Sequence, residues 1–129
     1  MKVAVIGSRN IEVKDVGAYL PPNVTGLISG GARGVDSAVR RYAVAEGIPL
    51  TEILPEYARY GRGAPLRRNE AIVARADLVV ALWDGSSRGT AHVIDLCRRL
   101  KKPVEVHILA PMPGDFKSGV VGEFADTKR

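Results

Sequence analysis

The chain has 129 residues, of which 46% are hydrophobic and 26% charged, and its formal net charge is +5. This composition is that of one globular domain with its own core, and it excludes a highly charged disordered chain. The longest apolar run, Leu78–Trp83, is far too short to cross a membrane, and the first residues lack the apolar segment of a signal peptide. Because Cys97 is the only cysteine, an internal disulfide is excluded, and we expect a cytoplasmic protein without a membrane partner.

Short apolar runs alternate along the chain with segments that repeat at a helical period. We expect strands over 2–6, 24–29, 50–54, 78–83 and 104–109, and helices over 11–19, 35–46, 65–76 and 89–101. Gly47 and Pro49 end the second of these helices, and Pro65 suits the first turn of the third. Such an alternation is typical of an α/β fold, in which a parallel five-stranded sheet forms the middle of three layers and helices cover both of its faces.

Two segments are less regular than the rest. Residues 55–64 form a polar, aromatic and basic loop after the third expected strand, where ligand-binding loops usually lie in α/β proteins. We expect the domain to cover residues 1–109. The Pro- and Gly-rich tail, residues 110–129, is expected either to add an edge strand through Gly119–Phe124 or to be disordered.

Three apolar runs each end in a glycine-containing turn that holds an arginine and leads toward a helix. Glycine lets the backbone approach a ligand closely, and the start of a helix offers unpaired N–H groups with partial positive charge. On neighbouring parallel strands such turns would converge on one anion, and the pattern favours the phosphate of a nucleotide-like small molecule. The residues of the three turns are Gly7, Ser8 and Arg9; Ser29, Gly30, Gly31, Ala32 and Arg33; and Asp84, Gly85, Ser86, Ser87, Arg88, Gly89 and Thr90.

The arginines gather in and beside these turns and the long loop. Seven of the thirteen arginines fall there, and none of the six lysines does. Arginine contacts phosphate through a planar, bidentate fork, whereas lysine is a flexible point charge. We therefore expect these arginines to surround an anion-binding edge of the sheet. The seven are Arg9, Arg33, Arg59, Arg62, Arg67, Arg68 and Arg88.

Four further residues have both a ligand-binding and a structural interpretation. Asp36, in the first turn of a helix, either accepts a hydrogen bond from a ribose hydroxyl or only interacts with the helix dipole. Asn69 falls on the apolar face of its helix, and either ties loops together or contacts the ligand. Trp83 is expected to pack in the core rather than stack on a base, whereas Tyr57, in the polar loop, is expected to stack on a base.

Cysteine and histidine provide no further chemistry. Cys97 shares an apolar helix face with Val93 and Leu100, which predicts a buried, unreactive thiol. His92 and His107 each lack a partner at metal-ligand spacing. The sequence therefore predicts no metal site and no cofactor.

The three turns and the segment Arg68-Asn69-Glu70, which lies between the second and third turns, together resemble the motifs of the SLOG superfamily. This superfamily includes the DNA-processing protein DprA and the LOG phosphoribohydrolases. The small single-domain YspA-like members look most similar, and the resemblance covers residues 3–109. It implies a Rossmann-like sheet of strand order 3-2-1-4-5 with a nucleotide or nucleotide-derived ligand over its carboxyl edge. It also implies a phosphate contact for Arg68 and a homodimer.

The resemblance does not extend to the catalytic glutamate of the LOG enzymes. Their motif is Pro-Gly-Gly-x-Gly-Thr-x-x-Glu, and Val93 stands at the position of its glutamate. An apolar side chain cannot accept a proton or stabilise an oxocarbenium ion during N-glycosidic hydrolysis. Glu70 and Asp84 are candidate carboxylates that could replace it.

We therefore expect a protein that binds, senses, carries or sequesters a nucleotide or nucleotide derivative, rather than an enzyme. The alternative is a LOG-like phosphoribohydrolase acting on nucleoside monophosphates. Single-stranded nucleic-acid binding, as in DprA, ranks third, because the positive charge is expected at the rim of a pocket and not along a lysine-rich stripe.

Overall fold

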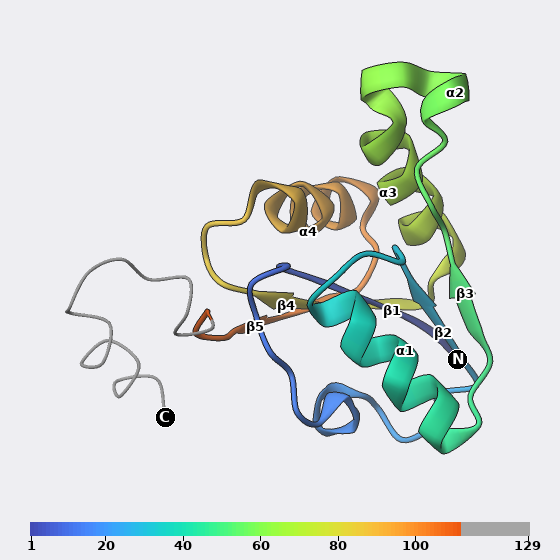
Figure 1. Ribbon diagram of the computed structural model, residues 1–129, viewed down its shortest axis with the longest axis vertical. Coiled ribbons are helices and arrows are strands. Elements are labelled where there is room, and N and C mark those ends of the chain that lie inside the picture. Colours follow the sequence, from blue (N-terminus) through green and yellow to red (C-terminus); the bar gives the residue numbers. More distant parts are fainter. Residues whose placement is uncertain (112–129) are drawn as a thin grey trace.

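The computed structural model describes residues 1–111 and contains a five-stranded, all-parallel sheet in the order β3-β2-β1-β4-β5 (Figure 1). The predicted α/β fold class and strand order are therefore confirmed. The expected strands are present, most of them a residue or two shorter or longer than predicted. They are β1 (Lys2–Gly7), β2 (Gly26–Ser29), β3 (Leu50–Glu52), β4 (Leu78–Trp83) and β5 (Val104–Ile108).

Helices cover both faces of this sheet, as predicted. α1 (Val35–Glu46) and the short 3-10 helix η1 (Val16–Tyr19) lie on one face, and α3 (Ala64–Arg75) and α4 (Arg88–Leu100) lie on the other (Figure 1). Each long helix begins near the carboxyl edge of the sheet, because each follows a parallel strand, α3 after the short helices of residues 57–63. The starts of all three helices are therefore brought to one edge.

The two faces of β1 belong to two separate cores. Val3 and Val5 are buried against α1 and η1, whereas Ala4 and Ile6 are buried against α3 and α4. This alternation follows from the two-residue period of a strand. Because β1 is hydrogen-bonded to β2 on one side and to β4 on the other, both cores hold it in place.

The expected helix over 11–19 is wrong. Ile11 and Val13 are buried while Glu12 and Lys14 between them are exposed, which is the period of an extended segment. Only the 3-10 turn η1 forms at its end. The segment therefore packs, mostly as extended chain, on the same face of the sheet as α1.

The long connection over 55–64 is more ordered than a loop. It contains one short helix, α2 (Tyr57–Tyr60), and one 3-10 turn, η2 (Gly61–Gly63), which lead directly into α3. Figure 1 shows α2 projecting beyond the sheet, next to the start of α3. The predicted edge strand through Gly119–Phe124 lies outside the described residues. Within residues 1–111, no helix is long and apolar enough to cross a membrane.

Gly34 marks the point where α1 packs against the turn after β1. Its backbone has φ +70° and ψ −120°, a conformation that residues with a side chain rarely adopt. A Cβ added there would lie 2.7 Å from Cα of Arg9. The turn that holds Arg9 and the start of α1 can therefore touch only because residue 34 is glycine.

We predict that Gly34→Ala lowers the free energy of unfolding by about 3 kcal/mol, since it combines backbone strain with a clash. Gly47→Ala is the matched control: Gly47 also has a positive φ, +67°, but a Cβ there meets nothing within 4 Å. That control should cost about 1 kcal/mol. Urea unfolding measures both, and equal losses in the two variants would contradict the packing argument.

Candidate functional site

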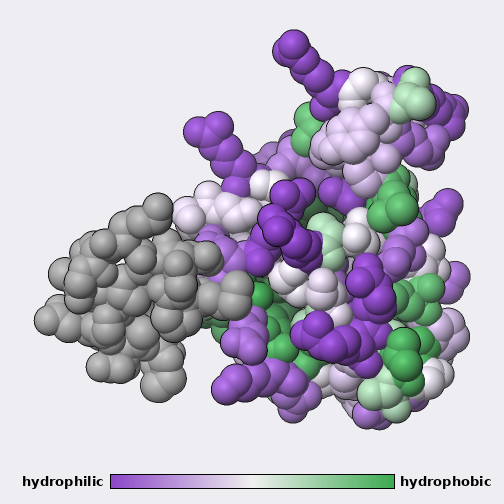
Figure 2. All heavy atoms as spheres, viewed as in Figure 1, coloured by the Kyte–Doolittle hydropathy of each residue, from purple (hydrophilic) through white to green (hydrophobic). Residues whose placement is uncertain are grey.

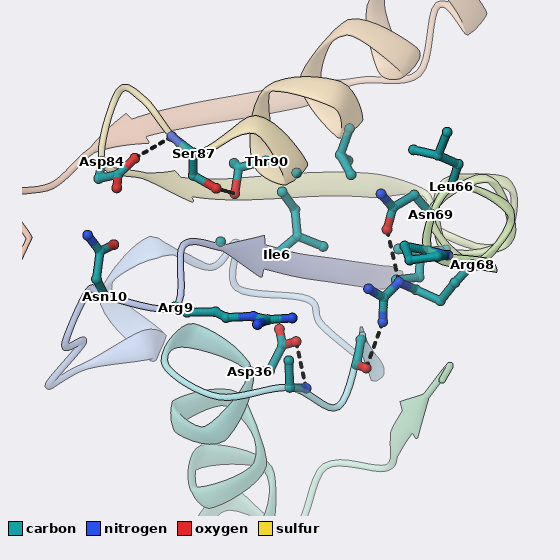
Figure 3. Close-up of a pocket in the computed structure, with 17 residues that line it drawn as sticks. Ile6, Arg9, Asn10, Asp36, Leu66, Arg68, Asn69, Asp84, Ser87 and Thr90 are labelled. Carbon is teal, nitrogen blue, oxygen red and sulfur yellow. Dashed lines mark hydrogen bonds between the residues drawn. The ribbon is translucent and has the colours of Figure 1, made fainter. Parts of the chain in front are cut away.

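A cavity of about 480 Å³ opens at the carboxyl edge of the sheet, between the ends of β1 and β4 (Figure 3). The chain leaves these two neighbouring strands in opposite directions along the sheet, β1 toward β2 and β4 toward β5. In open α/β sheets, ligands bind in the crevice that such a reversal creates. The volume lies within the range of small-molecule sites.

All three predicted glycine turns reach this cavity. Each contributes some of its residues, and α3 adds two polar side chains that were also predicted. The predicted residues that line the cavity are Gly7, Arg9, Gly30, Ala32, Asp36, Arg68, Asn69, Asp84, Ser87, Gly89 and Thr90.

Other predicted residues lie just outside the cavity and shape its turns. Ser8 is buried, and its Oγ accepts the backbone N–H of Asp84 at 3.2 Å. Ser29 is buried too, and its Oγ accepts the N–H of Gly31 at 3.4 Å. Trp83 packs partly into the core and donates Nε1–H to the Ser87 carbonyl at 3.0 Å. The remaining residues of the turns that do not line the cavity are Gly31, Arg33, Gly85, Ser86 and Arg88.

The aromatic loop is not brought to this cavity. Tyr57 lies on α2 with 61% of its surface exposed and does not line the cavity. Tyr60 is instead stacked under two arginines, with the guanidinium carbons of Arg59 and Arg67 at 5.0 and 5.7 Å from its ring centre. The arginines expected at one edge are therefore split, and of the seven only Arg9 and Arg68 line the cavity.

An apolar wall of the cavity was missed by sequence reasoning. Ile6, Ile72 and Val93 are buried there, and Leu66 is 49% exposed beside them. Figure 3 shows Ile6 in the middle of the cavity floor. The sequence did hold a signal: Ile6 lies one residue before the end of β1, on the α3 and α4 side, and Val93 follows Gly89 by one helical turn. Asn10 and Pro65 complete the lining that was not predicted.

The start of α4 presents unsatisfied backbone donors to the cavity. Asp84 Oδ1 accepts the N–H groups of Ser86 and Ser87 at 2.9 and 2.8 Å, so these two amides are already used. The next three amides, of residues 88–90, precede the first possible helical hydrogen bond. The described residues supply no side-chain cap to them. The anion-binding part of the turn is therefore the first turn of α4, and not the amides before it.

The pKa values of two carboxyl groups near the cavity are shifted in opposite directions. Burial raises the pKa of Asp36 from its ordinary value, although the N–H of Ala32 (2.9 Å from Oδ2) and the charge of Arg68 oppose this shift. At Asp84, partial burial acts in the same direction, but hydrogen bonds from the N–H groups of Ser86 and Ser87 and from the side chains of Asn10 and Ser8 together outweigh it and lower the pKa. Asp36 therefore holds a proton more readily than Asp84 does.

Arg68 ties α3 to the turn after β2. Its Nη1 donates to the carbonyls of Gly30 and Ile53 at 2.9 and 3.4 Å, and its Nε donates to Asn69 Oδ1 at 3.0 Å. The amide nitrogen of Asn69 lies 3.5 Å from Nδ1 of His92 on α4. Asn69 therefore does tie segments together, and it also lines the cavity. Burial lowers the pKa of Arg68, but an arginine remains charged in proteins.

The second carboxylate named as a catalytic candidate lies elsewhere. Glu70 is exposed on α3, and its Oε1 is 3.6 Å from Nη1 of Arg67. It lines a different cavity, beside Tyr60 and Leu54. In the described part of the chain, no group of three or more His, Cys, Asp or Glu side chains is arranged to hold a metal ion.

Comparison with known proteins adds no assignment: neither a family model, nor a curated protein, nor a solved structure matches this chain.

The opposite pKa shifts of Asp36 and Asp84 predict opposite pH dependences of stability. A folded-state pKa above that of the unfolded chain, about 3.9, means that the contribution of Asp36 to stability is lost as the pH rises through the folded-state value. For Asp84, whose folded-state pKa is lowered, the contribution is present above the unfolded value and is lost as the pH falls.

The measurement is urea unfolding of Asp36→Asn and Asp84→Asn from about pH 3 to about pH 7. Stability of the wild type relative to Asp36→Asn should fall as pH rises, and stability relative to Asp84→Asn should increase. Slopes of the same sign would contradict the opposite pKa shifts of the two carboxyl groups.

Proposed function

We propose that this protein binds a nucleotide or nucleotide-derived small molecule in the cavity between the ends of β1 and β4. The observation that carries the proposal is the meeting, in one cavity, of the uncapped start of α4, the guanidinium of Arg9 and an apolar wall. A phosphate requires the first two of these, and a base or sugar face requires the third.

The lining suggests how such a ligand lies. Its phosphate accepts hydrogen bonds from the amides of the first turn of α4 and from Thr90 Oγ1, with Arg9 balancing the charge. Its base or ribose packs on Ile6, Ile72 and Val93. Asp36 lies on the side of the cavity away from α4, below Arg9 in Figure 3, and accepts a hydrogen bond from a ribose hydroxyl. The resemblance to the SLOG superfamily supports this ligand class, and also a homodimer in the cytoplasm.

One observation favours hydrolysis of an N-glycosidic bond as the second candidate. Asp36 is 8% exposed, lines the cavity and has a raised pKa, which are properties of a general acid. Against this, Val93 forms part of the apolar wall at the position of the LOG glutamate, and Asp84 holds backbone amides at the rim. We therefore place binding before catalysis.

Native mass spectrometry of the purified protein, followed by a thermal-shift screen of nucleoside mono- and diphosphates, cyclic nucleotides and ADP-ribose, tests the binding proposal. A ligand at about one hundred times its dissociation constant adds roughly 2.7 kcal/mol to stability, which raises the melting temperature measurably. Flat melting curves across the whole set would refute it.

We predict that Gly89→Val abolishes binding of the nucleotides found in this screen while the fold survives. A Cβ at Gly89 meets nothing within 4 Å, so protein atoms tolerate it, but it stands at the cavity where the phosphate would lie. The matched control is Gly63→Val, since Gly63 is also free of neighbours within 4 Å but lies outside the cavity. Unchanged affinity in Gly89→Val would show that the phosphate does not use the start of α4.

We predict that the wild type releases no free base from nucleoside monophosphates above the uncatalysed rate, as measured by chromatography of the reaction mixture. Turnover within the ordinary enzyme range of about 1–10³ per second, lost in Asp36→Asn or Asp84→Asn, would make the protein a phosphoribohydrolase.

A further inference from the structure

A second cavity, of about 540 Å³, lies on the other side of the turn after β1 and shares Arg9 and Asn10 with the first. Ile11 and Val13 contribute apolar surface to this cavity too, but three arginines also line it, Arg9, Arg33 and Arg41. It lies against α1, and Figure 2 shows hydrophilic side chains gathered over that helix. Because Arg9 lines both cavities, they adjoin at this residue, and one ligand that passes the Arg9 side chain can contact residues of both.

The sequence spacing and the backbone bring these arginines together. Arg33 lies in the turn just before α1, whereas Ser37 and Arg41 are four residues apart within the helix and lie on one side of it. The close contact between Gly34 and the backbone of Arg9 fixes Arg33 beside the β1 turn. Ser37 Oγ donates to the Ala32 carbonyl at 3.3 Å, which fastens the same turn to the helix.

The positive charge of this cavity is not balanced within residues 1–111. Arg9, Arg33 and Arg41 have no ion pair there, whereas the neighbouring Arg40 is paired with Glu52 at 2.8 Å. Glu12 is the one acidic residue in this lining. Three arginines and one glutamate give the lining a formal net charge of +2. Unpaired arginines around a concave surface are suited to an anion with several oxygen acceptors.

We infer that the ligand has two linked phosphate groups, as in a nucleoside 5′-diphosphate or a diphosphate ester of a nucleoside. This inference rests on the proposed function and specifies its ligand. The phosphate nearer the nucleoside lies at the start of α4 in the first cavity. The second extends past Arg9 to Arg33 and Arg41 in the second cavity.

The test compares, by isothermal titration calorimetry at fixed ionic strength, the 5′-mono- and 5′-diphosphates of adenosine, guanosine, cytidine and uridine. For the base that binds, the wild type should bind the diphosphate about tenfold more tightly than the monophosphate, which is the effect of one charge-assisted contact. Arg41→Ala should remove that gain and leave the monophosphate affinity unchanged. Arg33→Gln, in a turn rather than a helix, provides the same test if Arg41→Ala is unstable.

The matched control is Arg98→Ala, which removes the same charge from the exposed last turn of α4, at the opposite edge of the sheet. It should keep the full gain for the diphosphate. Equal affinities for mono- and diphosphates, or a gain that survives in both Arg41→Ala and Arg33→Gln, would overturn the inference and leave nucleotide binding intact. Absence of binding by all eight nucleotides would overturn this inference, and the proposed function would fall with it if the cyclic nucleotides and ADP-ribose of the thermal-shift screen also fail to bind.

Discussion

The close pairing of β1 with β4, and the turn that this pairing forces at the end of β1, is the constraint on which the rest of the structure depends. β1 and β4 are in register from Val3 opposite Leu78 to Gly7 opposite Leu82, and the N–H of Ser8 continues the ladder to the Leu82 carbonyl at 3.2 Å. A Cβ on Gly7 would lie 2.6 Å from Cγ2 of Val35, so the first turn of α1 packs directly on the strand end. Both halves of the sheet meet at this glycine.

The electrostatics of the site follow from that geometry. The chain turns away from β1 and β4 to opposite faces, so the starts of α1 and α4 flank one strand end. The start of α4 has free amides, whereas at α1 the Asp36 carboxylate already accepts the Ala32 amide. An anion is therefore favoured on the α4 side, with Arg9 between the two helix starts. The same arrangement buries Asp36, and this burial raises its pKa although the charge of Arg68 opposes the shift.

Much of this could be predicted from the sequence, because the strands and the three long helices have clear hydrophobic periods and clear ends. Glycine turns after apolar runs also identified most of the polar cavity lining. The helix predicted over 11–19 was wrong because Ile11, Val13 and Val16 fit a helical and an extended pattern about equally. Burial against the sheet decides between the two patterns.

The apolar wall of the cavity was missed for a different reason. Ile6 and Ile72 look like ordinary core residues until the sheet order places them beside an opening. Likewise, Asp84 accepting the amides of Ser86 and Ser87 is a local turn that spacing alone does not reveal.

The most direct test of the central claim, a nucleotide phosphate between the turn after β1 and the start of α4, is an NMR titration of the ¹⁵N-labelled protein with a nucleoside 5′-diphosphate that binds. A bound phosphate changes the shielding of the amides it contacts more than that of distant ones. The account predicts that the largest amide shift changes occur at Gly7, Ser8, Arg9, Gly89 and Thr90. Saturable changes confined to β5, or to α2 and its tyrosines, would contradict it.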